Sequence, residues 1–498
     1  MRKRLGLVIV TAWLAASAGT APAWAEDLVT IAPAPAGEQL SNDFEVSVEG
    51  QAVPVYRCRV SAVPLNQVWP GYQRPLDQTE LASFASWDMV GGAEVKVRSR
   101  LLPIQTVAVR PSSLKIKPAV NGDTITFRLP RPCFTTVEIN GAHQALHLFA
   151  NPPEMDAPQP TDPGVRYFGP GVHRPAKIVL ESNQTLYVAG GAVVYGAVHA
   201  SGASHVRVLG RGIIDASDFE RGQGGGVISL SDCSDVVIDG VVMRDPDVWC
   251  CSLFGCRNVR ISQVKLVGLW RYNADGIDLC NSRDITVRDC FVRAFDDCIV
   301  LKGLKGAYSD RPVQNVDVGG CVIWNDWGRA LEIGAETCAP EISHVTFHDC
   351  DVIRTVHIAM DIQHGDGAAV HDIRFENIRV EIDDLTPPPR MQRSRDEKYV
   401  LDAKSGFCPE LLVIIVTRTF YSKDDQRGTV RNVVFKDIAV TGRSSPASRL
   451  QGFDADHGID GVSFENVRIN NRPVTNAPSG GLAIGAHVTD IRFRVPRP

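Results

Sequence analysis

The chain has 498 residues, of which 44% are hydrophobic and 22% charged, as is usual for a folded soluble protein. A formal net charge of only −5 and the lack of a basic stripe argue against a nucleic-acid partner. The length suits two or three domains, or one long repeat with an accessory domain.

Residues 1–25 have the pattern of a secretory signal peptide. The basic residues Arg2–Arg4 precede a mostly apolar run from Leu5 to Ala18, and Ala23–Ala25 form a small-x-small cleavage site. A membrane anchor is the alternative, but the apolar run is short for a bilayer span. We therefore predict cleavage after Ala25 and an exported protein, periplasmic or extracellular, with no membrane association after cleavage.

Residues 26–150 alternate short strand-like runs with turn residues, which predicts a small antiparallel β-sandwich. The runs are Phe44–Val48, Val95–Val97, Thr124–Phe127, Thr136–Ile139 and Leu146–Phe149. The stretch 151–164 contains five prolines and is predicted to be a linker or a stiff bridge.

Residues 165–498 carry a repeat that reads apolar, variable, apolar, polar, turn-forming, apolar, as in Ile285–Cys290. It starts at residues 206, 236, 259, 285, 316, 345, 373, 433, 462 and 491. Alternation predicts a half-buried strand, and Asp, Asn or Gly at the fifth position favours a turn. Most intervals are 23 to 31 residues, which predicts a right-handed parallel β-helix.

A second set of strands keeps step with the repeat. It comprises 276–279, 298–301, 330–333, 359–362 and 411–415. The 60-residue interval between 373 and 433 is either two turns, or one turn with a long insertion. The break in the repeat over 381–428 could wall a cleft or form a surface loop, and both interpretations stay open.

The 13 cysteines are an odd number, so at least one thiol is free or pairs between chains. Cys290, Cys321 and Cys350 stand where neighbouring repeats carry Val or Ile, and we predict that they pack in the core. No cysteine spacing resembles a zinc site, and the spacing of the histidines follows the repeat. We predict no metal and no cofactor; disulfide pairing and oligomeric state stay open.

The most informative residues are aspartates in two short stretches. Asp275 and Asp297 lie 22 residues apart, one coil of the predicted helix, so they should stack on neighbouring turns about 4.8 Å apart. Asp296 can join them only if the backbone bends, because consecutive strand residues face opposite sides. Clustered carboxylates are the chemistry of glycoside hydrolysis. Asp278 is interpreted as a turn residue.

Four stretches resemble glycoside hydrolase family 28, the polygalacturonase family. They are Leu186–Val193, Leu209–Asp215, Asn273–Asp275 and Asp296–Cys298. A β domain before the helix is similar to the layout of family 49, the dextranase and isopullulanase family. The resemblance implies a β-helix that inverts the anomeric centre with an aspartate trio: Asp296 as general acid, with Asp275 and Asp297 orienting and deprotonating the attacking water.

Two departures from family 28 bear on the substrate. Arg329 replaces the histidine of the family's Gly-His-Gly motif, and Asp361-Ile362-Gln363 stands where the family has Arg-Ile-Lys. Arg and Lys recognise a uronate carboxylate by charge-assisted hydrogen bonds, whereas Asp361 would repel it. We therefore expect a neutral glycan.

Seven residues are candidates for contacts with the sugar, each with a plainer interpretation. Tyr272 and Trp327 could stack on sugar rings or fill the core. Arg329 and Glu332 could line the cleft or form a local ion pair, and Asp361 could be a solvated turn residue. The remaining candidates are Asn273 and His364.

The leading hypothesis is an exported inverting glycosidase that cleaves α-linked, neutral poly- or oligosaccharides. One alternative is a polygalacturonase whose charge clamp comes from Arg329 or from basic residues of the insertion. Another is a non-catalytic glycan-binding β-helix. A lyase or epimerase is disfavoured because no Arg, Lys or His set is recognisable near the aspartates. Sugar identity, linkage, and endo or exo action stay open.

Overall fold

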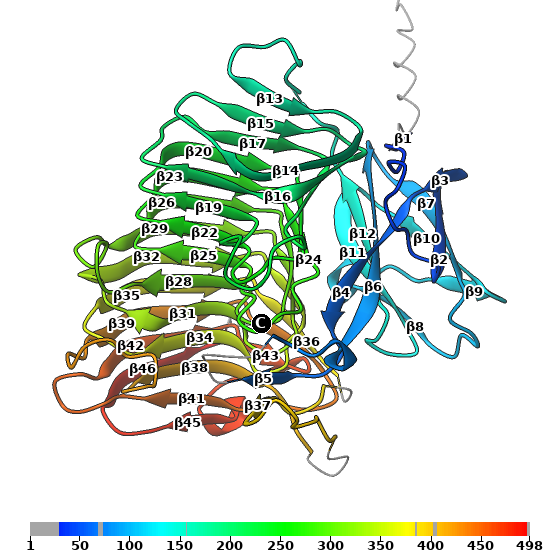
Figure 1. The fold of residues 1–498 in the computed structure, drawn as a ribbon. Coiled ribbons are helices and arrows are strands. Elements are labelled where there is room, and N and C mark those ends of the chain that lie inside the picture. Colours follow the sequence, from blue (N-terminus) through cyan, green and yellow to red (C-terminus); the bar gives the residue numbers. More distant parts are fainter. Residues whose placement is uncertain (1–28, 68–72, 156, 384–385, 402–405, 496–498) are drawn as a thin grey trace, which may run out of the picture.

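The computed structural model describes residues 29–67, 73–155, 157–383, 386–401 and 406–495. The predicted signal peptide therefore lies outside the described residues. The fold class is confirmed: the chain forms a long parallel β-helix beside a smaller N-terminal β domain (Figure 1). In the described residues, the only helices are the 3-10 turns η1 (Leu76–Gln78), η2 (Ser112–Leu114) and η3 (Pro478–Gly480), and none could span a membrane.

The N-terminal domain consists of two sheets that enclose a common apolar core. The larger sheet contains β1 (Val29–Thr30), β4 (Val55–Ser61), β6 (Thr79–Met89), β8 (Val107–Arg110), β11 (Cys133–Ile139) and β12 (Leu146–Asn151). The smaller contains β2 (Phe44–Val48), β3 (Gln51–Val53), β7 (Ala93–Ser99), β9 (Ala119–Asn121) and β10 (Thr124–Leu129). Pairing is antiparallel except between β6 and β12. The core forms because alternate residues such as Val46, Val95 and Val97 turn inward.

The repeat predicted from the sequence forms the first face of the β-helix, a twelve-stranded parallel sheet. Its strands are β13 (Val165–Phe168), β15 (Thr185–Val188), β17 (Arg207–Gly210), β20 (Ser234–Asp239), β23 (Arg257–Ser262), β26 (Arg283–Arg288), β29 (Val313–Gly319), β32 (Glu341–His348), β35 (Ala369–Glu376), β39 (Thr429–Lys436), β42 (Ile459–Glu465) and β46 (Val488–Arg494). β35 pairs directly with β39, so the long interval between positions 373 and 433 is one turn with an insertion.

The fifth repeat position bends the chain, as predicted. Asp289, Asp349 and Asn377 all have φ between 52° and 55°, in the left-handed region that Asp and Asn tolerate. Cys290, Cys321 and Cys350 follow such bends and are buried free thiols in the core, which confirms their packing role.

β14 (Gly171–Val179) and β16 (Ala192–Ser201) lead into two further series of parallel strands. The second face contains β18 (Ile213–Asp215), β21 (Val242–Arg244), β24 (Lys265–Val267), β27 (Phe291–Ala294), β30 (Val322–Asn325), β33 (Asp351–Arg354), β36 (Arg379–Ile382), β40 (Ala439–Gly442) and β43 (Arg468–Ile469), with β44 (Arg472–Pro473) added antiparallel. The third contains β19 (Ile228–Ser231), β22 (Cys251–Phe254), β25 (Ile277–Cys280), β28 (Ile299–Gly303), β31 (Arg329–Thr337), β34 (Ile358–His364), β38 (Glu410–Val416), β41 (Ser448–Gln451) and β45 (Leu482–Ile484).

The N-terminal domain covers the second face through an apolar interface. Phe84 and Phe149 from the domain pack with Phe291 and Trp324 from the β-helix, and the Phe149 and Phe291 ring centroids lie 5.1 Å apart. Arg354 donates to Glu138 across the interface at 3.0 Å. The interface therefore fixes the domain beside the turns that join the second face to the third.

Candidate functional site

The predicted aspartates lie in consecutive turns between the second and third faces. Ile277 pairs with Ile299, so Asp275 and Asp297, each two residues earlier, occupy equivalent positions on adjacent coils. The Gly276 amide donates to the Asp297 carbonyl at 2.8 Å. On the next coil Leu331 pairs with Ile299, which places Arg329 beside Asp297. The one-coil spacing thus stacks these side chains as expected.

The chain bends at Asp296, as the sequence argument required. Residues 295 and 296 form a bend before β28, and the Asn325 amide donates to the Asp296 carbonyl at 2.7 Å. Gly328 packs against this bend so closely that a Cβ there would lie 2.6 Å from Asp296 Oδ1. The bend brings Asp296 and Asp297 into one electrostatic cluster, in which the charge of Asp297 acts on Asp296.

Lys302 joins two of the aspartates in the interior of the site. Its Nζ lies 2.6 Å from Asp275 Oδ2 and 2.9 Å from Asp278 Oδ1. The interpretation of Asp278 as a turn residue is therefore wrong: it lies in β25 and is fully buried. Lys302 is also a cation beside the aspartates that was not recognised from the sequence.

Burial and the ion pairs have opposite effects on the pKa values of Asp275, Asp278 and Lys302. Burial raises the pKa of Asp275 well above its usual range, Lys302 opposes the rise, and Asp278 adds to it. Burial likewise raises the pKa of Asp278, to about 6, against Lys302. Burial disfavours the Lys302 ammonium, but Asp275 and Asp278 outweigh it and raise the pKa of Lys302. Lys302 thus keeps its charge and forms ion pairs with two carboxyl groups.

Asp296, at the bend, also has a raised pKa. Burial, and after it the charge of Asp297, raises its pKa to about 7, while Arg329 and Lys302 oppose the shift. A carboxyl group that stays protonated up to neutral pH can donate a proton to a leaving group. Burial and the neighbouring carboxyl groups therefore create a proton donor at the bend.

Arg329 lies at the centre of a second charged cluster. Its Nε is 3.3 Å from Asp361 Oδ2, its Nη1 is 3.7 Å from Asp297 Oδ1, and its Nη2 donates to Gln363 Oε1 at 2.9 Å. Glu332 lies 3.9 Å from Arg329 Nε. Burial, followed by Asp297, raises the pKa of Glu332, and burial raises that of Asp361 to about 7. Three carboxyl groups thus surround one guanidinium.

Three of the predicted sugar contacts do not face the site, and two of them are aromatic. Tyr272 is 2% exposed, and its hydroxyl donates to Gln78 Oε1 at 2.9 Å. Trp327 is 7% exposed, and its Nε1 donates to the Arg390 carbonyl at 3.0 Å. Both rings pack in the core under segments from elsewhere in the chain. The prediction that they contact sugar is therefore wrong, and both are packing residues.

The prediction that His364 contacts sugar is wrong for a different reason. In β34, Met360 and Ile362 belong to the helix core, and alternation turns His364 inward with them. It is fully buried, and its Nδ1 lies 2.8 Å from Thr337 Oγ1. Asn273, by contrast, is exposed beside the aspartates, with its Nδ2 3.4 Å from Asp275 Oδ1.

Three residues near the aspartates were not predicted from the sequence. Asn66 of the N-terminal domain places its Nδ2 3.4 Å from Asp296 Oδ2. The Trp249 ring lies over Lys302, with its centroid 4.0 Å from Nζ. Tyr421 is 41% exposed, and burial together with the Asp296 charge raises its pKa to about 12. Asn66 and Tyr421 come from distant parts of the chain, so no local pattern links them to the aspartates.

Described parts of the insertion over 381–428 lie close to the carboxylate cluster. β37 (Arg390–Gln392) pairs with β5 (Leu65–Gln67) of the N-terminal domain, and the loop that carries Tyr421 lies near Asp296. Asp366 anchors this loop, because its Oδ1 accepts from the Lys423 amide at 2.6 Å. Parts of the insertion therefore pack against the N-terminal domain and approach the aspartates.

Asp366 also belongs to a group of possible metal ligands. Ligand-type atoms of Cys338, Asp366 and Asp424 lie within 4.8 Å of one another. The Asp366 carboxylate already accepts from the amides of Thr337, Lys423 and Asp424. The geometry is that of a loop anchor.

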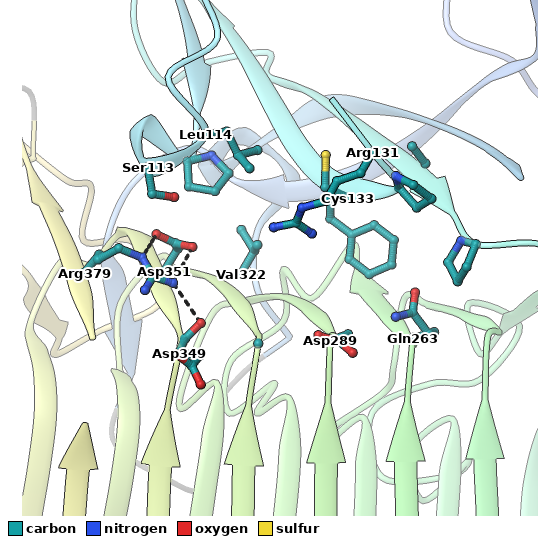
Figure 2. Close-up of a pocket in the computed structure, with 16 residues that line it drawn as sticks. Ser113, Leu114, Arg131, Cys133, Gln263, Asp289, Val322, Asp349, Asp351 and Arg379 are labelled. Carbon is teal, nitrogen blue, oxygen red and sulfur yellow. Dashed lines mark hydrogen bonds and ion pairs between the residues drawn. The ribbon is translucent and has the colours of Figure 1, made fainter. Parts of the chain in front are cut away.

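A separate cavity of about 710 Å³ lies between the N-terminal domain and the turns of the β-helix (Figure 2). Arg131, Asp289 and Arg379 line it, and Arg379 Nε donates to Asp351 Oδ1 at 2.6 Å. None of the predicted catalytic aspartates is among its lining residues. It is thus distinct from the carboxylate site.

The fold and the carboxylate cluster define a parallel β-helix of the kind found in glycoside hydrolases. Residues 181–387, which contain every aspartate of the cluster, match the family model for glycosyl hydrolases family 28. The resemblance stated above is therefore confirmed, and the match supports a glycosidase. No curated protein matches the chain in sequence.

Solved structures that resemble nearly the whole chain include the following two. Dex49A from Penicillium minioluteum has a TM-score of 0.52 and 15% identity, and covers 93% of this chain and 96% of its own. The family 28 exopolygalacturonase from Yersinia enterocolitica has a TM-score of 0.50 and 13% identity, and covers 94% of this chain and 96% of its own. At these identities the likeness shows the shared fold alone.

Proposed function

We propose that this protein is an inverting glycosidase that hydrolyses α-linked, neutral glycans. The observation that carries the proposal is the cluster of Asp275, Asp296 and Asp297 at one turn position. Inversion needs one protonated carboxyl group and one ionised carboxyl group with space for water. The raised pKa of Asp296, about 7, suits the acid.

In the proposed reaction Asp296 gives its proton to the glycosidic oxygen as the bond to the anomeric carbon breaks. Asp297 and Asp275 hold a water molecule on the opposite face of the ring and take up its proton as it attacks. Lys302, 2.6 Å from Asp275, opposes the rise that burial causes in the pKa of that carboxyl group. The water oxygen becomes the new anomeric hydroxyl group, with inverted configuration.

The charge distribution supports a neutral substrate. Lys302 is paired with Asp275 and Asp278, and Arg329 is surrounded by Asp297, Asp361 and Glu332. Cations that are already neutralised make poor partners for a uronate carboxylate, because binding would leave other carboxyl groups buried and unpaired. The same pairing, rather than a lack of cations, now argues against a lyase or an epimerase.

The test is substitution of the proposed acid together with a panel of polymers. We expect Asp296→Asn to lower turnover by at least about a hundredfold while the protein stays folded. Dextran, pullulan, nigeran and polygalacturonate would be compared, and NMR would identify the anomer first released. Near-normal activity of Asp296→Asn, or a retained anomer, would contradict the mechanism.

A polygalacturonase is the second candidate, because the family 28 match covers the whole carboxylate cluster. Release of reducing ends from polygalacturonate alone would favour it. Binding to one polymer with no reducing ends released would favour a non-catalytic glycan-binding protein. An unsaturated product detected by ultraviolet absorbance would instead indicate a lyase.

Export is proposed from the sequence alone. Cleavage after Ala25 predicts a mature protein that begins at Glu26. Sequencing the N-terminus of protein recovered from the periplasm or the medium tests this. Protein in the membrane fraction that still begins at Met1 would indicate an anchor.

A further inference from the structure

The N-terminal domain reaches the carboxylate site through β5. In this short strand Leu65 pairs in parallel with Arg390 of β37, and the Arg390 amide donates to the Pro64 carbonyl at 2.9 Å. β37 is fixed in turn, because the Arg390 carbonyl accepts from Trp327 Nε1. Trp327 directly precedes Gly328, which packs against Asp296. A continuous set of contacts therefore places β5 beside the bend.

Asn66 is the residue of β5 that faces this bend. Its side chain is buried, and its Nδ2 lies 3.4 Å from Asp296 Oδ2. The distance is long for a hydrogen bond in the free protein, but such contacts at catalytic groups shorten when substrate binds.

We propose that Asn66 is a positioning residue that holds the Asp296 carboxyl group toward the glycosidic oxygen, so that the N-terminal domain completes the active site. The inference rests on the proposed function, in which Asp296 is the acid.

The charges around Asp296 explain why a neutral amide suits this role. Four acidic groups interact electrostatically with Asp296. They are Asp275, Asp278, Asp297 and the Tyr421 hydroxyl. Its cationic neighbours are Arg329, Lys302 and Arg221. A cation at position 66 would favour the ionised acid and remove the proton needed for catalysis. An amide can orient the carboxyl group without adding a charge.

The kinetic test compares Asn66→Ala and Asn66→Asp with the unchanged protein, on whichever of the four polymers it hydrolyses. We expect Asn66→Ala to lower kcat about tenfold with little change in KM, because the contact is to the acid rather than the sugar. Asn66→Asp adds a carboxylate beside Asp296, so the alkaline limb of kcat/KM should move to higher pH. Asn121→Ala, an exposed position of the same domain, is the matched control.

A second measurement needs no substrate and keeps the proposal testable if one variant folds poorly. Unfolding by urea is compared for Asn66→Ala in the unchanged protein and in an Asp296→Ala background. If the two side chains interact, the equilibrium constant for unfolding rises by a smaller factor in the Asp296→Ala background. Equal factors, or an unchanged kcat and pH profile, would overturn the role of Asn66.

The two levels of the proposal can fail separately. If Asp296→Asn is inactive but the Asn66 variants match the unchanged protein, only the positioning role fails. If Asp296→Asn stays active, the acid is misassigned and the proposed function fails with it.

Discussion

Substitution of Lys302 by Met tests the charge balance on which the site depends. The lysine is 3% exposed, and its ammonium group lies 2.6 Å and 2.9 Å from the carboxyl oxygens of Asp275 and Asp278. Removing one partner of a buried ion pair costs about 3–5 kcal/mol, mainly because the remaining charge is left uncompensated. Here two carboxyl groups lose their partner at once, so we expect a loss near the upper end of that range at pH 7.5.

The pH dependence of this loss distinguishes charge from packing. Without Lys302 the folded-state pKa values of Asp275 and Asp278, already raised by burial, rise further. A group whose pKa is raised on folding destabilises the protein above its unfolded pKa of about 3.9, and the penalty vanishes below it. The loss in Lys302→Met should therefore shrink steadily from pH 7.5 to pH 5.

Urea unfolding followed by tryptophan fluorescence at pH 5, 6 and 7.5 measures the effect as a shift in midpoint. The control is Lys436→Met, which removes a partly exposed lysine that contacts Glu376, and we expect no measurable change. A loss for Lys302→Met that is the same at all three pH values would indicate packing alone. A loss below about 1 kcal/mol at pH 7.5 would refute the buried-charge argument.

Three further predictions follow from particular contacts. Gly328→Ala should lower kcat/KM about tenfold or more, since its Cβ would lie 2.6 Å from Asp296 Oδ1, whereas Gly169→Ala meets its nearest neighbour at 3.5 Å and should leave steady-state kinetics unchanged. Tyr421→Ala should raise KM several-fold and Tyr421→Phe much less, because a half-exposed ring beside the acids suits stacking on sugar. A KM for Tyr421→Ala equal to that of the unchanged protein would contradict this. Phe375→Ala should cost about 3–5 kcal/mol in urea unfolding without moving the pH profile, since the ring is stacked 5.0 Å from Phe347 and 5.1 Å from Phe435; a shifted profile would show coupling to the site.

The fold could be predicted because equivalent residues of a solenoid recur in the sequence at intervals of one coil. Alternation gave the strands, Asp and Asn at the fifth position gave the bends, and the interval between Asp275 and Asp297 gave their stacking. Each of these signals is local or repeats once per coil. The insertion could not be placed in this way, because it interrupts the repeat and pairs with β5, which belongs to a different domain far earlier in the chain.

The errors at the site have the same origin. Tyr272 and Trp327 follow the pattern of exposed cleft aromatics, but Gln78 and the Arg390 carbonyl, both distant in sequence, cover their polar atoms. Lys302 could have been found from the sequence. It pairs with Cys280 on the coil that carries Asp275 and Asp278, and a lysine stem is long enough to cross one strand spacing. Alternation along β28 was the missing step.

The corrected site gives the neutral-glycan proposal a firmer physical basis. In the sequence, Asp361 and Gln363 stand where family 28 has cations, and they concern one end of the cluster. The structure shows that the cations at the site are paired: Lys302 lies beside two carboxyl groups and Arg329 beside three. A uronate would have to displace one of these partners and would add a negative charge beside Asp296, which would raise the pKa of the acid further. A neutral sugar meets the same groups as hydrogen-bond partners and leaves their charges balanced.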